Sequence, residues 1–407
     1  MNRIAVVVQR CHESVVGGSE ALAWQYANLL KDAYEVDVLS TTAVDIFDWA
    51  NELPEGDEVR DGVRIRRFPV TTGRTSFWSK LNDRMGNDFR RSAAGVRQLT
   101  DDVRCLPWSI SLQEEFIRTQ GPHSEPLLIY LRERWSDYQT IIFVTYLYPT
   151  SYFGMWEVPP RRALFAPTLH DELPAYLSVY KHAAHRAREV MWLTDAERRF
   201  GQTIWGELPG RVVAMRVETE LHEPAKLSTP YVLYSGRIDP NKGCRELFEY
   251  FIEFKKRHPS DLRLILTGKD DMAVAEHPDI EFRGFVSDDE KYSLMAGARA
   301  FVIPSAHESF SIVTLEAMAQ RAPVVANGLS EVLSDHVRES GGGMTYKSYR
   351  SFAAALSELL ADDGLRAAMG ARGREYTVAR YTTERVKESL TSAVESCASP
   401  AGINGAQ

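Results

Sequence analysis

Short apolar runs alternate with longer, helically periodic segments along most of the chain. Five runs in the first half predict the strands of one sheet: RIAVVVQR, EVDVLST, QTIIFVTY, ALFAPT and REVMWLT. Five more predict a second sheet: YVLYSGR, LRLILTG, IEFRG, AFVIPS and PVVAN. Strands that alternate with helix-length segments are typical of parallel α/β sheets. The pattern therefore predicts two α/β domains.

Breaks in this rhythm predict the domain boundaries. HEPAKLSTP, residues 222–230, is polar and bounded by proline, so we expect an N-terminal domain over 1–222 and a C-terminal domain over 229–380. A terminal helix is expected over 381–396, where it could cross back to the N-terminal domain. Residues 397–407 read as a disordered tail.

Residues 75–137 interrupt the strand and helix rhythm and predict a helical insertion in the first domain. Arginines alternate there with acidic residues, which usually marks a solvated helix face. Two sharper hypotheses stay open. The insertion could be a lid over a cleft, or a basic patch for an acidic acceptor or for peripheral contact with a membrane.

Composition and charge exclude several classes of protein. The chain has 407 residues, 44% of them hydrophobic, which is enough for two cores. A net charge of −8 argues against nucleic acid as a partner. The first apolar run is too short for a signal peptide or a membrane span, so we expect a cytoplasmic protein. Reduced, isolated thiols are expected at the four cysteines, Cys11, Cys105, Cys244 and Cys397, which lack metal-ligand spacing.

The stretch HESFSIVTLEAMA, residues 307–319, places Glu308 and Glu316 eight positions apart. Helical spacing of the apolar residues predicts a helix that begins near Phe310, with Ser309 or Ser311 as its N-cap. Glu308 then lies in the entering loop and Glu316 on the helix. The free N–H groups of a helix start bind anions, so Glu308 would lie beside a bound phosphate and could accept hydrogen bonds from sugar hydroxyls. Glu316 could reach a ribose diol, as acidic residues do in dinucleotide folds.

A second stretch, LYSGRIDPNKGCRELFEYF, carries two cations between a predicted strand and a predicted helix. Ligands of parallel α/β sheets bind beyond the carboxyl ends of the strands, where this loop must lie. Arg237 offers a planar fork of donors and Lys242 a compact charge, which suits a diphosphate. Gly236 and Gly243 flank the two cations, and Gly243 permits close approach of the backbone.

These two stretches resemble the nucleotide-sugar domain of family-4 glycosyltransferases. The resemblance extends to TGKDD and to the segment from IEFRGFVSDDEKYSLMAGARAFVIPS to RAPVVA. Members of this family are retaining enzymes of the GT-B architecture, in which two Rossmann-like domains face each other across a cleft. The likeness covers most of residues 230–345, and two glutamates separated by seven residues are the family signature. It implies that Arg237 and Lys242 bind the diphosphate, Glu308 the donor sugar and Glu316 the ribose.

The resemblance also implies a wider substrate-binding set, and the chain departs from the commonest family pattern at three positions. The set comprises Gly17, Gly18, Gly236, Gly243, Gly268, Phe285, Ser309, Phe310, Ser311, Ile312 and Glu316. Many members have glycine where this chain has Ser309, Ser311 and Arg321. The donor's identity therefore stays open.

The first domain carries two weaker signals. A glycine pair follows the first strand, and in the family this loop touches the donor's β-phosphate. His170, in FAPTLHDELPAYL, matches a family histidine that lines the cleft near the donor sugar and the acceptor. A metal site built from His170, Asp171 and Glu172 is the alternative, although consecutive residues of one loop rarely converge on one ion. A purely structural role also stays open.

Together these observations predict a retaining glycosyltransferase that moves a sugar from a UDP or GDP sugar to an acceptor hydroxyl, with no metal or other cofactor. Its predicted catalytic residues are His170, Glu308, Arg237 and Lys242. A glycan, a lipid-linked glycan or a small molecule would fit as acceptor, in cell-surface glycan or secondary-metabolite biosynthesis. Such an enzyme would be cytoplasmic, with contact at the inner face of the membrane left open. The rival hypotheses are a sugar-nucleotide epimerase of the same architecture and a non-catalytic scaffold.

Overall fold

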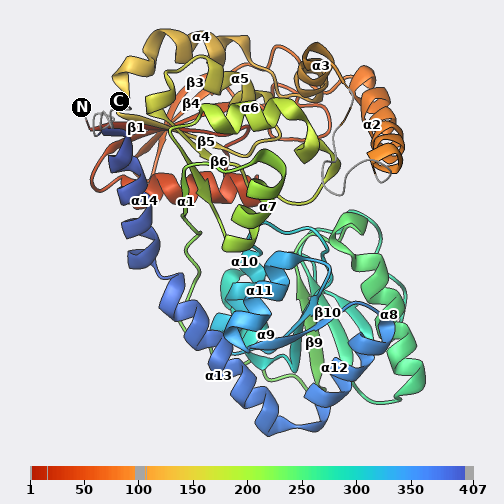
Figure 1. The fold of residues 1–407 in the computed structure, drawn as a ribbon. Helices are drawn as coiled ribbons and strands as arrows, with labels where there is room; N and C mark the ends of the chain where they lie inside the picture. Colours follow the sequence, from red (N-terminus) through yellow and green to blue (C-terminus); the bar gives the residue numbers. More distant parts are fainter. Residues whose placement is uncertain (1, 16, 97–105, 107, 399–407) are drawn as a thin grey trace, which may run out of the picture. The chain divides into compact units, whose positions relative to one another are not determined.

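A computed structural model describes residues 2–15, 17–96, 106 and 108–398. The chain divides into two compact units, Met1–Ala214 with Lys387–Gln407 (unit 1) and Met215–Val386 (unit 2) (Figure 1). The division thus precedes the segment 222–230 at which the sequence placed the junction. The residues in between belong to unit 2 because their backbone bonds to it: Val217 N–H donates to Tyr381 O at 2.9 Å, and Ala225 N–H to Ser293 O at 2.9 Å.

Unit 1 is built on an eight-stranded sheet in the order β3-β4-β2-β1-β5-β6-β7-β8. Neighbouring strands are parallel except β3, which is antiparallel to β4. The strands are β1 (Arg3–Val7), β2 (Glu35–Thr41), β3 (Gly56–Arg60), β4 (Val63–Phe68), β5 (Thr140–Val144), β6 (Ala163–Ala166), β7 (Glu189–Trp192) and β8 (Gly210–Val212). The five predicted strands are confirmed as β1, β2, β5, β6 and β7. Strands β3, β4 and β8 were not predicted from apolar runs, because polar residues interrupt these strands near the sheet edges.

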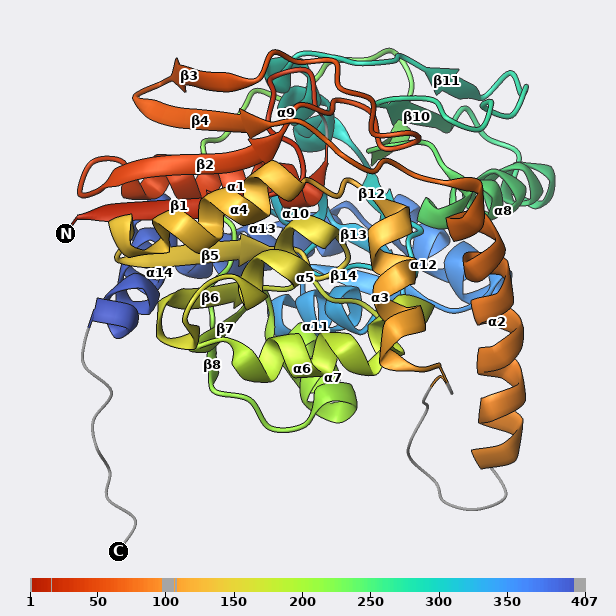
Figure 2. The ribbon, with the colours of Figure 1, turned by 90° about the horizontal axis from the view of Figure 1, so that it is seen from above.

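Up to Ala214, the described part of unit 1 contains seven α-helices and three short 3₁₀ turns. The helices are α1 (Gly18–Leu30), α2 (Ser76–Val96), α3 (Ile110–Gln120), α4 (Glu125–Arg134), α5 (Pro149–Trp156), α6 (Ser178–Arg186) and α7 (Asp195–Trp205), and the turns are η1 (Trp135–Asp137), η2 (Pro160–Arg162) and η3 (Leu173–Tyr176). Helices α2, α3 and α4 occupy the region of the predicted insertion, and α2 packs against α3 (Figure 2). Residues 97–105 and 107 of that region lie outside the described residues.

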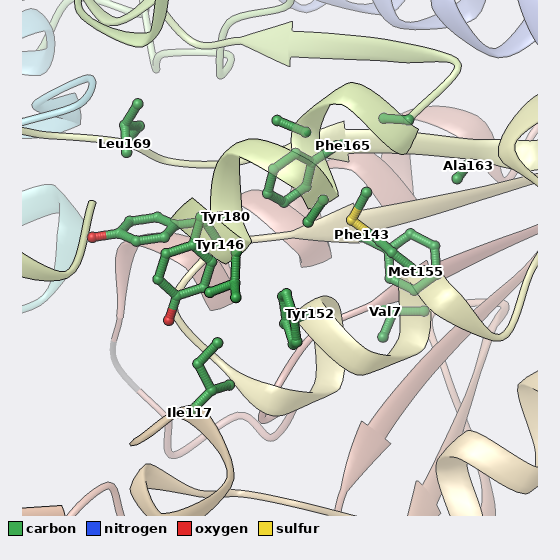
Figure 3. Close-up of a cluster of buried hydrophobic side chains, with 14 of the residues drawn as sticks. Val7, Ile117, Phe143, Tyr146, Tyr152, Met155, Ala163, Phe165, Leu169 and Tyr180 are labelled. Carbon is green, nitrogen blue, oxygen red and sulfur yellow. The ribbon is translucent and has the colours of Figure 1, made fainter. Parts of the chain in front are cut away.

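Aromatic side chains fill the core of unit 1 beneath the strand ends (Figure 3). The rings of Tyr146 and Tyr180 meet edge to face at 4.8 Å, and Phe165 of β6 stacks on Trp205 at 6.4 Å. All four side chains are at most 2% exposed. Because these rings come from β6, α6, α7 and the loop after β5, they fix the loops at the carboxyl edge of the sheet.

Unit 2 contains a six-stranded, all-parallel sheet in the order β11-β10-β9-β12-β13-β14. Its strands are β9 (Tyr231–Ser235), β10 (Arg263–Thr267), β11 (Ile280–Phe282), β12 (Ala300–Ile303), β13 (Val324–Asn327) and β14 (Gly343–Tyr346). The five predicted strands are confirmed as β9 to β13. Its helices are η4 (Pro240–Lys242), α8 (Cys244–Arg257), α9 (Asp288–Gly297), α10 (Ile312–Ala319), α11 (Glu331–Ser340), α12 (Tyr349–Ala361) and α13 (Asp363–Arg380). The strand order reverses between β9 and β12, where ligands of open α/β sheets bind.

Helix α14 (Thr383–Ala398) begins in unit 2 and from Lys387 onward belongs to unit 1. Lys387 Nζ lies 2.9 Å from Asp32 Oδ2, and Thr140 Oγ1 donates to Val394 O at 3.2 Å. The predicted tail beyond this helix lies outside the described residues. Over the part of the chain that the structure describes, no helix has both the length and the apolar character that a membrane span requires.

Candidate active site

Two of the predicted catalytic residues meet at the point where the strand order of unit 2 reverses. Lys242 ends the 3₁₀ turn after β9, and Glu308 lies in the loop after β12. Lys242 Nζ lies 2.8 Å from Glu308 Oε1. The lysine side chain is 33% exposed and the glutamate side chain 12% exposed, so the pair lies at the surface of this edge. A cation and a carboxylate are thus held together at the position where the fold favours a ligand.

Glycines let the neighbouring loops approach this pair closely. Gly243 and Gly268 have φ of +76° and +123°, values that side chains rarely adopt. A Cβ on Gly268 would clash with the carbonyl oxygen of Gly236, and one on Gly243 with that of Pro304. The loops after β9, β10 and β12 therefore pack backbone against backbone.

Arg237 follows Gly236 in the loop after β9, and its side chain is 44% exposed. Its nearest acidic partner is Asp239, whose Oδ2 lies 3.8 Å from the guanidinium Nε. The carbonyl oxygen of Arg237 accepts a hydrogen bond from the hydroxyl of Tyr234 at 2.7 Å, which holds the backbone in place. A loosely paired guanidinium of this kind can turn toward an incoming anion.

The helix after Glu308 begins two residues later than expected. We predicted a start near Phe310, but α10 begins at Ile312 and Ser311 is its N-cap. Ser311 has φ of +61°, in the left-handed region, so the right-handed helix cannot extend back through it. The buried Phe310 is held through its carbonyl oxygen, which accepts a hydrogen bond from His336 Nε2 at 2.9 Å. Ser309 remains in the loop.

Glu316 lies on α10 with its carboxylate buried. Its Oε1 accepts hydrogen bonds from the hydroxyl of Tyr292 at 3.0 Å and from Lys291 Nζ at 3.3 Å. Its Oε2 is buried and has no hydrogen-bond partner within the described part of the chain. Burial raises the pKa of Glu316, and the charge of Lys291 opposes the rise. This oxygen is thus a buried acceptor whose hydrogen-bonding capacity is unused within the described residues.

Two further predicted residues lie around this edge. Phe285 follows β11, and 66% of its surface is exposed. Ile312 is half-buried at the first turn of α10. An exposed aromatic ring at a strand end can stack on a flat ligand.

The predicted residues of unit 1 lie at the carboxyl edge of its own sheet. Gly17 is the N-cap of α1, and a Cβ there would clash with the carboxylate of Glu20; Gly18 begins the helix with open space around it. His170 follows β6, and its Nδ1 lies 3.7 Å from Glu172 Oε1. That carboxylate also accepts a hydrogen bond from the hydroxyl of Tyr146 at 2.5 Å. The described residues contain no group of three His, Cys, Asp or Glu side chains that could hold a metal ion.

Our reading of the sequence missed the carboxylate that supports the His170 loop. Glu197, on α7, accepts hydrogen bonds from the backbone N–H groups of Leu169 and Leu193, both at 2.5 Å. Burial raises the pKa of Glu197 to about 8, and these N–H donors oppose the rise. The signal that could have revealed it is the pattern Thr194-x-x-Glu197, which resembles a capping box. No local pattern predicted Lys291 or Tyr292 as partners of Glu316.

Solved structures share this two-unit architecture. The sucrose-phosphate synthase of Thermosynechococcus elongatus matches with a TM-score of 0.69 and 18% identity over 97% of this chain and 98% of that chain. Anabaena HepE, solved in complex with UDP and glucose, matches with a TM-score of 0.66 and 14% identity over 97% of this chain and 100% of its own. The chain therefore has the GT-B fold of glycosyltransferases.

The sequence of unit 2 matches a known family over most of its length. Residues 218–376 match the model of the family named Glycosyl transferases group 1. The D-inositol 3-phosphate glycosyltransferase of Kineococcus radiotolerans is 31% identical over 219 residues, 44% of this chain and 50% of that relative. The chain spans about half the length of the curated relatives it matches. Residues 218–376, most of unit 2, are therefore similar to the group 1 glycosyltransferases, in agreement with the resemblance seen in the sequence.

Proposed function

We propose that this protein is a retaining glycosyltransferase that transfers a sugar from a nucleoside-diphosphate sugar, with UDP or GDP, to an acceptor hydroxyl. One observation carries the proposal: Lys242 and Glu308 meet at 2.8 Å at the strand-order reversal of unit 2, beside glycine-lined loops. The match of residues 218–376 to the group 1 glycosyltransferases supports it. The UDP and glucose bound to HepE support the donor class.

Each group in this site has a use in donor binding. The diphosphate would form ion pairs with Lys242 and Arg237. Glu308 would then be released from Lys242 and could accept hydrogen bonds from the sugar hydroxyls. Glu316 Oε2, which has no partner within the described residues, would accept a hydrogen bond from a ribose hydroxyl. Phe285 offers its exposed ring to the base.

The chemical step breaks the bond between the anomeric carbon and the diphosphate oxygen. Negative charge then grows on the leaving diphosphate, where fixed cations stabilise the transition state more than the ground state. In the retaining course that we propose, the acceptor oxygen attacks from the face that the diphosphate leaves. A phosphate oxygen takes the acceptor proton, and His170 hydrogen-bonds the sugar or the reacting oxygen.

The reaction requires no metal in this proposal, because Arg237, Lys242 and the N–H groups at the start of α10 carry the charge of the diphosphate. Turnover should therefore persist in excess chelator. Loss of turnover that added magnesium or manganese restores would contradict this part of the proposal. As acceptor we propose a glycan, a lipid-linked glycan or a small molecule, and we place the reaction in the cytoplasm or at the membrane's inner face.

The proposal is tested with a panel of UDP and GDP sugars. Each is incubated with the full-length protein, with and without a pool of candidate acceptors, and all products are separated by mass and by sugar identity. Transfer predicts a new glycoside only with acceptor, together with free nucleoside diphosphate. A new sugar nucleotide formed without acceptor would indicate an epimerase instead. If the protein neither binds nor turns over any nucleotide sugar, the scaffold hypothesis would remain.

A further inference from the structure

Two buried donors without a hydrogen-bond partner among the described residues lie in unit 1, in the segment after β4. The guanidinium carbon of the half-buried Arg74 lies 4.4 Å from the centre of the Trp78 ring and 6.0 Å from that of Trp49. Within the described residues, Arg74 Nε and Trp78 Nε1 are buried without a hydrogen-bond partner. Among the described residues, none forms an ion pair with Arg74. Burial lowers the pKa of Arg74, but arginine remains charged at neutral pH.

A second arginine near Trp49 shows the contrast. Arg10 lies 5.7 Å from the centre of the Trp49 ring. Its Nε and one terminal nitrogen lie 2.7 and 2.6 Å from Glu20 Oε1, and its other terminal nitrogen donates to Val44 O at 2.6 Å. Arg10 is therefore ion-paired within the protein, whereas among the described residues Arg74 has only the more distant charge of Asp45. A half-buried cation without an ion pair is costly, and a ligand anion would offset that cost.

The surrounding backbone holds Arg74 in a fixed place. Its N–H donates to Asp48 O at 3.2 Å, and Trp49 Nε1 donates to Gln120 O at 2.8 Å. A Cβ on Gly121 would clash with the Trp49 ring, so these segments pack closely. The donors of Arg74 and Trp78 are thus presented by a supported segment.

These donors lie near the reversal of strand order in unit 1, between β1 and β5. Tyr148 follows β5 and meets Trp49 edge to face at 5.2 Å. Burial raises the pKa of Tyr148 to about 12, so its hydroxyl keeps its proton and can donate. A guanidinium, an indole N–H and a phenol hydroxyl all donate, and an oxyanion is the ligand that accepts from all three.

We propose that Arg74 and Trp78 bind the oxyanion of an acidic acceptor, so that this protein glycosylates a molecule that carries a phosphate or a carboxylate. The inference rests on the proposed function, because it assigns the acceptor class of the same reaction. A soluble sugar phosphate, a uronic acid and a phosphorylated lipid share this chemistry, and the test separates them.

Binding is measured by calorimetry on the full-length protein saturated with UDP or GDP, so that the anion site of unit 2 is already filled. The probes are glucose 6-phosphate, glucuronic acid and vesicles with phosphatidic acid; glucose and vesicles of neutral lipid are the uncharged controls. We expect at least one charged probe to bind and both uncharged controls to fail. The probe that binds identifies the source of the anion.

The variants Arg74→Met and Trp78→Phe should weaken binding of that probe, and Arg74→Lys should restore part of it. The expected loss for Arg74→Met is about 10- to 100-fold, the range for a charge-assisted hydrogen bond. Arg161→Met is the matched control, because Arg161 also lies over a tryptophan, 5.6 Å from the centre of the Trp135 ring, but precedes β6 at the opposite edge of the sheet. It should bind as the wild type does.

Three outcomes would overturn the inference: no charged probe binds, the uncharged controls bind equally, or Arg74→Met binds as the wild type does. Nucleotide binding by the same variants separates this failure from that of the proposed function. If UDP and GDP bind but the probes do not, the acceptor class is wrong and the proposed function stands. If neither nucleotide binds, the proposed function fails; probe binding that depends on Arg74 would still establish the anion site.

Discussion

Lys242 Nζ lies 2.8 Å from Glu308 Oε1, although the two residues are 66 positions apart in the chain. The pair joins the loops that follow β9 and β12. Because the lysine side chain is one-third exposed, the ion pair contributes at most about 1 kcal/mol to stability. We infer that its main effect is to hold the cation at the site until a diphosphate replaces the carboxylate.

Lys242→Met should therefore lower kcat by about 10²- to 10³-fold, the effect of losing one preorganised donor to the developing charge, with little change in melting temperature. Glu308→Gln should also reduce turnover. Because the side chains are in contact, the double variant should lose less than the two single losses combined. Lys256→Met is the control, since this lysine side chain of unit 2 is 69% exposed. Steady-state kinetics on all four proteins test this, and unchanged rates in Lys242→Met would remove the assignment.

The unpaired oxygen of Glu316 predicts a preference for ribose. A nucleoside diphosphate should bind about tenfold or more tightly than its 2′,3′-dideoxy analogue, because a hydroxyl donating to a carboxylate contributes about 1.5–3 kcal/mol. Glu316→Gln should reduce this preference, and Glu358→Gln on the exposed face of α12 should keep it. Calorimetric titration of both nucleotides measures it. An equal preference in wild type and Glu316→Gln would place the ribose elsewhere.

The left-handed conformation of Arg321 predicts a stabilising substitution. Arg321 has φ of +63°, follows the C-cap of α10 and is exposed. An L-residue in this conformation costs about 1–2 kcal/mol, so Arg321→Gly should raise the free energy of unfolding by about 0.5–1 kcal/mol after the added entropy of the unfolded chain. The control, Ala354→Gly inside α12, should lower it by about 1 kcal/mol. Denaturant unfolding measures both, and destabilisation by Arg321→Gly would refute the explanation.

His336 predicts a loss of stability in acid. Its Nε2–H donates to Phe310 O and its Nδ1 accepts from the hydroxyl of Tyr376 at 3.0 Å, so the folded ring is neutral. Burial lowers its pKa from 6.5 to about 4. The contribution of the neutral ring to the free energy of unfolding is therefore complete above pH 6.5. About 3 kcal/mol of this free energy is lost as the pH falls from 6.5 toward 4. The variant His336→Gln should be less stable than the wild type at pH 7, yet its free energy of unfolding should fall less steeply between pH 6.5 and 4. Equal slopes in unfolding titrations would contradict this.

Glu197 predicts a role in positioning the His170 loop. Glu197→Ala removes the carboxyl oxygens that accept from the backbone N–H groups of Leu169 and Leu193, so these buried donors lose their acceptor at a cost of about 1–3 kcal/mol each. We expect lower stability together with a fall in kcat, because Leu169 precedes His170. The control Glu133→Ala lies on the exposed face of α4 and should behave as wild type. A stability loss with an unchanged kcat would restrict Glu197 to a structural role.

Much of the fold could be predicted because buried parallel strands read as continuous apolar runs. Nine of the ten predicted strands follow this rule. The tenth, β11, lies at a sheet edge and is only partly buried, and β3 (GDEVR), also an edge strand, shows no apolar run. The start of α10 was misplaced because the conformation of Ser311 depends on its surroundings. Helical periodicity carries no signal of a left-handed residue unless glycine marks it.

The sequence by itself determined where ten of the strands lie and which strands Arg237, Lys242, Glu308 and Glu316 follow. Those assignments rest on local spacing, and local spacing decides which residues follow a strand. Only the tertiary structure decided which charged groups are neutralised. Arg10 is paired with Glu20, whereas Arg74 lies over an aromatic ring and forms no ion pair within the described residues. The physical reason is that ion pairing and burial depend on contacts between segments that the local sequence pattern does not specify.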